Sequence, residues 1–281
     1  MKIIDCCIYN GEDDLLDVRL NSLDAQVSRF VIVESDTSFT GIPKGYRFRA
    51  ENFNKFKNKI EYVKIGGNKE NYKDKKYWSS FKAEKWQREF YCRNSILEGL
   101  QGYAVDDDII LISDVDEIPN LVKLDLNVDV YSFKQQCAQL KLNLLNSGLT
   151  PYYGTKGIKF KHLGLPAEFR LYGREEFVDH IYGGLIAQTI QDGGWHFSYC
   201  MSAEKIMEKI KFYSHNERID MISEDKIQKC IKEKKDIWDG EFNNIDKEVD
   251  LKLMDNVFLP KYVRDNISKF KHLLAENTDD K

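Results

Sequence analysis

The chain has 281 residues, a formal net charge of −4, and hydrophobic and charged fractions of 42% and 31%. This length allows one large α/β domain, or a domain with an appendage. Because no basic tract stands out from a weakly acidic background, the composition argues against nucleic acid and anionic membranes as partners.

The cysteines and the amino terminus bear on the cell compartment. Six cysteines are scattered through apolar stretches without C-x-x-C pairing, which favours reduced core thiols over disulfides or a zinc site. The first stretch is apolar only until Asp5 interrupts it, too early for a signal peptide or a membrane anchor. We therefore predict a soluble, cytoplasmic protein without a membrane span.

The first part of the chain predicts alternating strands and helices. Strands are expected at 2–9, 29–34, 60–65 and 109–112, and helices at 13–23 and 79–100. This order predicts an α/β fold with an open, mainly parallel sheet. Ligands of such sheets bind over the carboxyl ends of the strands.

The most informative stretch runs from Asp108 to Pro119, DIILISDVDEIP. Its aliphatic run predicts a strand that is buried on both faces. Three carboxylates follow at the strand's carboxyl end, on Asp114, Asp116 and Glu117. Like charges this close repel each other unless a cation lies between them, and hard oxygen ligands suit Mg²⁺ or Mn²⁺. The stretch predicts a divalent metal site, with a solvated acidic strand end as the alternative.

After this stretch the pattern changes. Further strands are predicted at 130–134, 137–145, 157–161 and 168–172, and helices at 202–215, 223–235 and 260–274. Ser202 and Ser223 are the expected helix N-caps. Because no Pro/Gly/Ser-rich linker divides the chain, we predict a single domain over residues 1–281.

Five motifs then follow one another along the chain. They are Glu34-Ser with Thr37-Ser-Phe-Thr-Gly41, Trp86-x-x-Glu89-x-x-x-Arg93-Asn94, Asp114-Val-Asp-Glu-Ile-Pro119, Gly194-Trp-His-Phe-Ser198, and Lys209 with His215-x-Glu217. Together they resemble glycosyltransferase family 17, in order, from about residue 3 to about residue 262. A D-x-D motif alone is common, whereas five motifs in this order are specific.

The resemblance implies a GT-A type nucleotide-sugar-binding fold, with residues 1–119 as the nucleotide-binding half and 120–281 as the acceptor-side half with C-terminal helices. It also implies Mn²⁺ or Mg²⁺, a UDP-sugar donor, by analogy UDP-GlcNAc, inversion at the anomeric carbon, and a glycan or glycoconjugate acceptor. Golgi members carry an amino-terminal membrane anchor, whereas this chain begins at its first strand. That difference favours an enzyme of bacterial or viral type that works in the cytosol.

The resemblance assigns metal ligands. Asp116 is expected to bind the metal directly, and Asp114 to contact ribose or a metal-bound water. Glu117 is expected as a further ligand or as a residue that orients the sugar, with a salt bridge as the alternative. His196 is expected to complete the metal site, unless it is a core histidine beside Trp195.

Inverting transfer needs a base that takes the proton of the acceptor hydroxyl. Asp192, in a glycine-containing loop, is the first candidate for this catalytic role. Glu217, two residues after His215, is its rival, and Glu168 is a third candidate.

Other residues are expected to contact the donor or the sugar rings. Arg93 is expected to bind the diphosphate, or else to pair with Glu89 one turn earlier. Arg170 is a second phosphate or acceptor contact. Tyr9, Asn10 and Glu34 are expected at uracil and ribose, and Trp195, Phe197, Tyr152 and Tyr153 as sugar platforms unless they belong to the core.

Two other functions use the same acids. A nucleotidyl- or phosphoryl-transfer enzyme also needs carboxylates and a metal. A non-catalytic glycan-binding protein on the same fold needs neither donor turnover nor a base.

Overall fold

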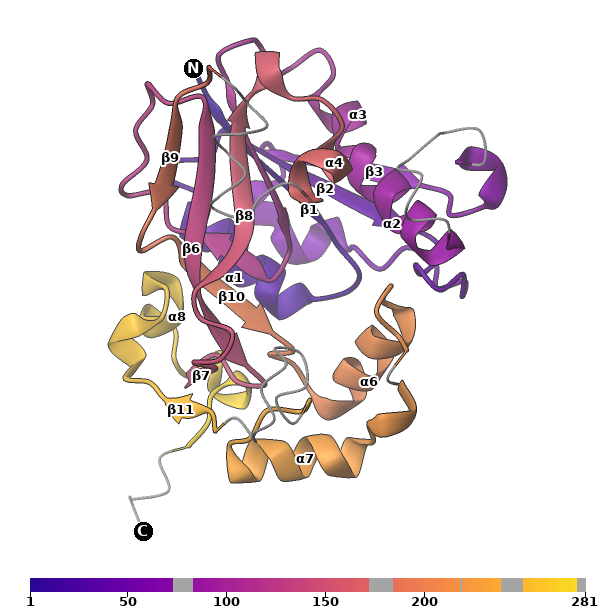
Figure 1. Ribbon diagram of the computed structural model, residues 1–281, viewed down its shortest axis with the longest axis vertical. Coiled ribbons are helices and arrows are strands. Elements are labelled where there is room, and N and C mark those ends of the chain that lie inside the picture. Colours follow the sequence, from indigo (N-terminus) through magenta and orange to yellow (C-terminus); the bar gives the residue numbers. More distant parts are fainter. Residues whose placement is uncertain (73–82, 172–183, 218, 239–249, 277–281) are drawn as a thin grey trace.

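The computed structural model describes residues 1–72, 83–171, 184–217, 219–238 and 250–276. It confirms the α/β fold with a mainly parallel first half of the sheet (Figure 1). The four strands of this half are β1 (Ile3–Ile8), β2 (Arg29–Ser35), β3 (Ile60–Ile65) and β4 (Ile109–Asp114). They pair in parallel in the order β3-β2-β1-β4, so their carboxyl ends meet at one edge.

Helices cover both faces of this parallel half. Its strands are runs of β-branched and aliphatic residues, and alternate side chains along β4 enter opposite clusters, Ile109 and Leu111 one and Ile110 and Ile112 the other. Helix α1 (Asp13–Leu23) packs in the first cluster. Helices α2 (Glu84–Asn94) and α3 (Ile96–Leu100) pack in the second. The predicted burial of β4 on both faces is confirmed.

The second half extends the sheet with mixed pairing. Its strands are β5 (Glu117–Pro119), β6 (Val130–Gln139), β7 (Leu144–Leu145), β8 (Tyr152–Lys159), β9 (Ala187–Ile190), β10 (Gly194–Ser198) and β11 (Lys252–Leu253). β8 joins β4 to β6 through antiparallel pairs, and β9 and β10 pair in parallel with β6. β10 also pairs with β5, the short strand that begins at Glu117.

A glycine permits the closest of these contacts. β10 pairs with β5 in antiparallel fashion, with Gly194 opposite Pro119. Gly194 has φ +111°, and a Cβ atom there would lie 2.1 Å from the carbonyl oxygen of Ile118. Only glycine fits this position. β10 therefore lies directly against the segment that carries the acids.

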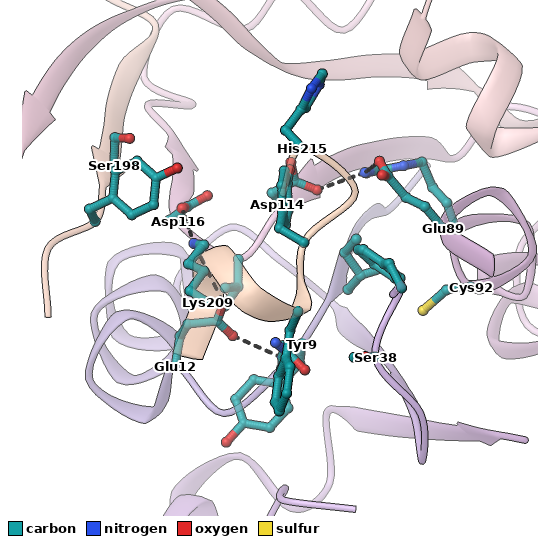
Figure 2. A pocket seen from close by; sticks show the side chains of 18 of the residues that line it. Tyr9, Glu12, Ser38, Glu89, Cys92, Asp114, Asp116, Ser198, Lys209 and His215 are labelled. Carbon is teal, nitrogen blue, oxygen red and sulfur yellow. Dashed lines mark hydrogen bonds and ion pairs between the residues drawn. The ribbon is translucent and has the colours of Figure 1, made fainter. Parts of the chain in front are cut away.

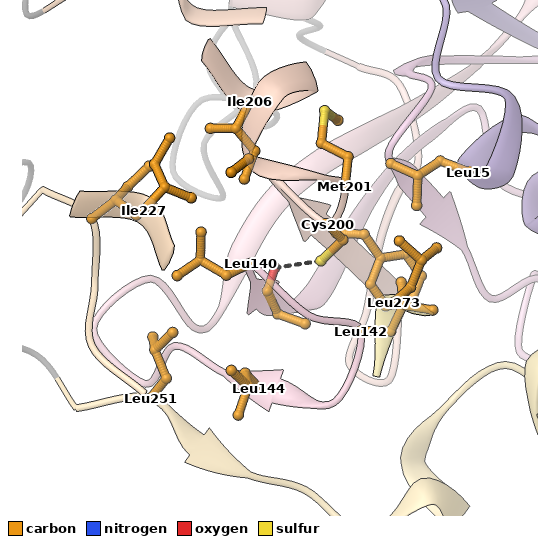
Figure 3. Close-up of a cluster of buried hydrophobic side chains, with 14 of the residues drawn as sticks. Leu15, Leu140, Leu142, Leu144, Cys200, Met201, Ile206, Ile227, Leu251 and Leu273 are labelled. Carbon is orange, nitrogen blue, oxygen red and sulfur yellow. Dashed lines mark hydrogen bonds between the residues drawn. The ribbon is translucent and has the colours of Figure 1, made fainter. Parts of the chain in front are cut away.

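A third core cluster lies under the C-terminal helices (Figure 3). Helices α6 (Ala203–Phe212), α7 (Glu224–Glu233) and α8 (Lys261–Asp265) contribute to it, as does α1. The predicted N-caps are confirmed, because Ser202 accepts from the backbone N–H of Lys205 and Ser223 from that of Lys226. None of the helices in the described ranges is long and apolar enough to cross a bilayer.

Some predicted elements differ in the structure. The predicted strand at 168–172 is helix α4 (Pro166–Leu171), with residue 172 outside the described residues. Proline is favoured in the first turn of a helix, and the Asn94 side chain accepts a hydrogen bond from the Ala167 N–H. The strands predicted at 130–134 and 137–145 are one long strand and a two-residue one, and residues 79–82 of the predicted helix are not described.

The remaining helical turns within the described ranges are short. They are 3₁₀ segments at Ala50–Phe56, Lys69–Asn71, Phe160–His162, Ile219–Met221, Asn256–Phe258 and Lys271–Leu273. The last of these and α8 replace the single C-terminal helix predicted at 260–274.

Candidate active site

A cavity of about 560 Å³ lies at the carboxyl edge of β1, β2 and β4, where the sequence places its polar strand ends. This volume is in the range of small-molecule sites. Its other walls come from α2, α4, α6, β8 and β10 (Figure 2). Polar and aromatic residues of the lining include Tyr9, Asn10, Glu12, Lys44, Trp86, Glu89, Arg93, Asp114, Asp116, Tyr152, Arg170, His196, Lys209, Tyr213 and His215.

Two guanidinium groups surround the first acid of the motif. Nη2 of Arg93 lies 2.9 Å from Oδ1 of Asp114, and Nη2 of Arg170 lies 3.5 Å from Oδ2. Burial alone would raise the pKa of Asp114, but the two arginines outweigh it and hold that pKa below its usual range. Asp114 is therefore a carboxylate in the cavity.

An ammonium group lies beside the second acid. Nζ of Lys209, from α6, is 2.8 Å from Oδ2 of Asp116 and 3.5 Å from Oε1 of Glu12. Burial would lower the pKa of Lys209, but the two carboxylates outweigh it and raise that pKa. Figure 2 shows the chain of contacts from Asp116 through Lys209 to Glu12. The sequence predicts a divalent cation among Asp114, Asp116 and Glu117; the structure places the Lys209 ammonium beside one of these acids, Asp116.

Arg19 holds the acidic segment from behind. This α1 side chain is fully buried and forms two hydrogen bonds, of 2.7 and 2.6 Å, with the carboxylate of Asp5. It also donates to the backbone carbonyl oxygens of Asp114, at 3.1 Å, and Glu117, at 2.6 Å. The backbone that carries the acids is thereby tied to α1 and β1.

Two predicted ligand-binding acids are used inside the protein. Glu117 is fully buried outside the cavity lining; it accepts hydrogen bonds from Arg170 and from the backbone N–H of Asp114. Burial raises the pKa of Glu117 to about 7. The salt bridge given as the alternative is present, and the role of metal ligand or sugar contact stays a prediction.

Glu34 is the second of these internal acids. It is fully buried and accepts from Lys44 Nζ at 3.0 Å, from the Tyr62 hydroxyl at 2.7 Å, and from the backbone N–H groups of Arg47 and Phe48. Its carboxylate thus has four donors within the protein, and the contact with ribose stays a prediction. The carboxylate positions Lys44, which lines the cavity.

The alternation of β10 decides which of its side chains reach the cavity. His196 faces it, whereas Phe197 is fully buried in the C-terminal core. Trp195 packs against that core, and its indole N–H donates to the Phe258 carbonyl at 2.6 Å. Trp195 and Phe197 therefore match the alternative, core packing, and neither lines the cavity.

The two tyrosines at the start of β8 also differ in whether they line the cavity. Tyr152 lines the cavity and stacks on His196, with ring centroids 4.0 Å apart, whereas Tyr153 is not part of the lining. Burial lowers the pKa of His196 to about 4, so its imidazole is neutral near pH 7. A neutral imidazole is the form that binds metal ions.

The three predicted bases lie outside the cavity lining. The Asp192 side chain is 73% exposed and pairs with Lys123. Glu217 lies on the surface and accepts from Lys85 at 3.1 Å, with Nδ1 of His215 at 3.2 Å. Glu168, on α4, is also absent from the lining. The structure therefore brings none of the three into the lining, and their role as base stays a prediction.

The donor set for a metal ion is incomplete in the protein alone. The described part of the chain holds no group of three or more His, Cys, Asp or Glu side chains that could bind a metal. Asp116 and His196 nevertheless line the same cavity. Because Mg²⁺-type sites often use one or two carboxylates and complete their shell with water and substrate phosphates, the chemistry of this pair fits Mn²⁺ or Mg²⁺.

Comparison with known proteins identifies the family. The model of glycosyltransferase family 17 matches residues 1–280. The chain belongs to this family. The predicted family is thus confirmed over nearly the whole sequence.

Curated relatives of this family 17 chain carry the name β-1,4-mannosyl-glycoprotein 4-β-N-acetylglucosaminyltransferase. The human and rat proteins are each 27% identical over 242 residues, which cover 74% of this chain and 42% of the relative. The mouse protein is 26% identical over the same lengths. The chain therefore spans less than half the length of these relatives.

Solved structures similar to the family 17 chain include two glycosyl-transferring enzymes. An active-site mutant of LgtC has 16% identity and a TM-score of 0.32, covering 66% of this chain and 72% of that one. Glucosyl-3-phosphoglycerate synthase from Mycobacterium tuberculosis, with Mn²⁺, UDP and phosphoglyceric acid, has 11% identity and a TM-score of 0.32, covering 69% of each chain.

Several lining residues of the family 17 chain were not predicted as site residues. Glu89 and Lys209 stand within motifs that carry the resemblance, so their motif membership was an available signal. Glu12 and Tyr213 carry no such signal, because one begins an ordinary helix and the other ends one. They reach the cavity only through the way α1 and α6 pack.

Proposed function

We propose that the chain transfers a sugar, N-acetylglucosamine, from its UDP donor to a hydroxyl group of a glycan, with inversion at the anomeric carbon. Family membership and the relatives' names support the sugar transfer. The observation that carries the donor assignment is the pair of arginines in the cavity. Nη1 of Arg93 and Nε of Arg170 are buried and have no hydrogen-bond acceptor among the described residues.

Buried guanidinium donors without an acceptor are costly, and phosphate oxygens satisfy them well. A diphosphate placed against Arg93 and Arg170 would supply these acceptors, with the Lys209 ammonium nearby. Tyr9 and Asn10, at the end of β1, would then contact the nucleoside. The same cations stabilise the charge that develops on the diphosphate as it leaves.

Asp116 and His196 are the residues that would hold Mn²⁺ or Mg²⁺. When bound, the ion supplies positive charge to the leaving diphosphate. Asp116 would share its carboxylate between this ion and Lys209. Asp114 contacts Arg93 and Arg170 and would orient these two guanidinium groups. It is not proposed as a ligand of the metal ion.

Donor binding is tested by thermal unfolding. At a hundredfold excess over the dissociation constant, a ligand stabilises the folded state by about 2.7 kcal/mol, which raises Tm by roughly 5–10 °C for a chain of this size. We expect UDP with Mn²⁺ to produce such a rise and EDTA to reduce it. An equal rise with orthophosphate alone would contradict recognition of a nucleoside diphosphate.

Turnover is tested by a screen of UDP- and GDP-sugars, measured as nucleotide released together with glycosyl product. Release with UDP-GlcNAc and a glycan acceptor supports the proposal. Phosphate release from simple phosphoesters without glycosyl product would instead support the phosphoryl-transfer class. Glycan binding without any donor turnover would support a binding protein.

Asp192→Asn and Glu217→Gln are expected to keep the transfer rate within about threefold of wild type, because neither carboxylate lines the cavity in which a general base must lie. Steady-state rates with saturating donor and acceptor check this. A hundredfold loss in either variant would return the catalytic base to that residue.

A further inference from the structure

The proposed transfer needs a base inside the cavity, within reach of the acceptor hydroxyl. The carboxylates in the lining belong to Glu12, Glu89, Asp114 and Asp116. We propose that Glu89 is the catalytic base; this inference rests on the proposed function and adds the residue that the transfer step lacks.

The other three acids are engaged by neighbouring groups. Asp114 lies between two guanidinium groups, at 2.9 and 3.5 Å. Asp116 accepts a hydrogen bond of 2.8 Å from Lys209. Glu12 accepts from the backbone N–H of Asn10 at 2.8 Å and has the same ammonium 3.5 Å from its other oxygen. Two guanidinium groups therefore face Asp114, and Asp116 is the acid that would hold the metal ion, so both are committed to other groups.

Two acids of the lining have a buried oxygen without a hydrogen-bond donor among the described residues, Oδ1 of Asp114 and Oε2 of Glu89, and the first of these lies 2.9 Å from Nη2 of Arg93. Glu89 is 8% exposed, and its Oε1 accepts from Nη2 of Arg93, one helical turn later, at 3.2 Å. Its Oε2 is buried and has no hydrogen-bond donor among the described residues. Figure 2 shows this carboxyl group on the Asp114 side of the cavity.

The unsatisfied groups of the cavity are complementary to the two substrates. Two arginine donors lack acceptors, as a diphosphate would supply. Oε2 of Glu89 lacks a donor, as a hydroxyl group would supply; Oδ1 of Asp114 also lacks one, but the Arg93 guanidinium already faces it. Because an unpaired buried oxygen costs free energy that a ligand donor recovers, Oε2 of Glu89 is the position at which the acceptor hydroxyl binds.

The wall beside Glu89 also suits a sugar. Trp86 precedes it by one turn of α2 and lines the same cavity together with His215, with the two ring centroids 4.8 Å apart. Aromatic rings offer apolar faces against which a pyranose ring packs. An acceptor sugar on this wall would place its hydroxyl between Glu89 and the donor phosphates.

The step is then a single displacement. Oε2 of Glu89 takes the proton of the acceptor hydroxyl while the hydroxyl oxygen forms a bond to the anomeric carbon. The bond between that carbon and the diphosphate oxygen breaks, and its electron pair leaves with the diphosphate. Glu89 afterwards releases the proton to solvent.

Glu89→Gln tests the assignment, because the amide oxygen can still accept from Arg93 while the side chain can no longer take a proton. We expect kcat to fall by roughly 10²- to 10⁴-fold, with the UDP dissociation constant within about threefold of wild type by calorimetry. Glu89→Asp, which keeps a carboxylate, is expected to recover at least part of the loss. Glu84→Gln, an exposed acid on the same helix, is the matched control and should match wild type.

The outcomes separate the two proposals. If wild type releases UDP from donor sugars but Glu89→Gln does so equally fast, Glu89 is not the base and the proposed function stands. If Glu89→Gln loses UDP binding in proportion to its rate, Glu89 only positions Arg93, and the inference is overturned. If wild type turns over no sugar nucleotide, the proposed function fails, and this inference fails with it.

Discussion

Asp116→Asn is expected to lower kcat/KM for sugar transfer by roughly 10²- to 10³-fold, the usual effect of removing one group that stabilises developing charge in an active site. The substitution keeps the shape of the side chain but removes the anion that holds Lys209 at 2.8 Å and that would bind the metal ion. Release of UDP from UDP-GlcNAc measures the rate. The Tm rise caused by UDP with Mn²⁺ should shrink in parallel.

A nearby acid provides the control. Asp107 lies in the turn before β4, is 65% exposed and pairs with Lys161 on the surface. Asp107→Asn removes a carboxylate seven residues before Asp114 along the chain and should leave both the rate and the Tm rise unchanged. An Asp116→Asn protein that keeps the full Mn²⁺-dependent rise would show that the ion binds elsewhere.

Arg19→Met is expected to lower the free energy of unfolding by about 3–5 kcal/mol, the usual cost of removing one partner from a buried ion pair. It leaves the Asp5 carboxylate, which is 1% exposed, without its guanidinium partner. It also leaves the Asp114 and Glu117 carbonyls without this donor. Urea unfolding followed by circular dichroism measures the change.

A double variant and a surface pair test the origin of this loss. Asp5→Leu combined with Arg19→Met removes both charges, so it should recover part of the stability. Arg29→Met breaks a surface pair, 27% and 44% exposed, and should cost about 1 kcal/mol or less. If Arg19→Met and Arg29→Met lowered the free energy of unfolding equally, burial would not add to the cost of breaking the Arg19–Asp5 pair.

The parallel half of the sheet could be predicted from sequence because its strands are continuous aliphatic runs bounded by polar residues. β3 has the predicted bounds, and β4 extends only two residues beyond its predicted end. The segment at 168–172 has no such run, and a contact from Asn94, distant in sequence, helps to fix its helical start. Local pattern carries no information about that contact.

The site was predictable only in part for the same reason. Polar residues at strand ends located the cavity, but sequence could not show that Glu117 pairs with Arg170, 53 residues later. Alternation along β10 predicts two faces without saying which one meets the cavity, so His196 and Trp195 could not be told apart. Oε2 of Glu89 lacks a hydrogen-bond donor because no described residue places one beside it. This depends on how residues distant in sequence pack, which the sequence does not show.

The hydrogen bonds from Arg19 to the carbonyls of Asp114 and Glu117 have a consequence for affinity. The segment from Asp114 to Glu117 is ordered when the protein folds, so the entropy of ordering it is lost on folding and not on binding. A sugar nucleotide that binds therefore finds the carboxylates already in position. Side chains that must move when the donor binds are then those on other elements, such as Lys209 on α6. Differences in donor preference among variants of this chain should therefore arise in the side chains that reach in from α2, α4 and α6, while the segment from Asp114 to Glu117 stays constant.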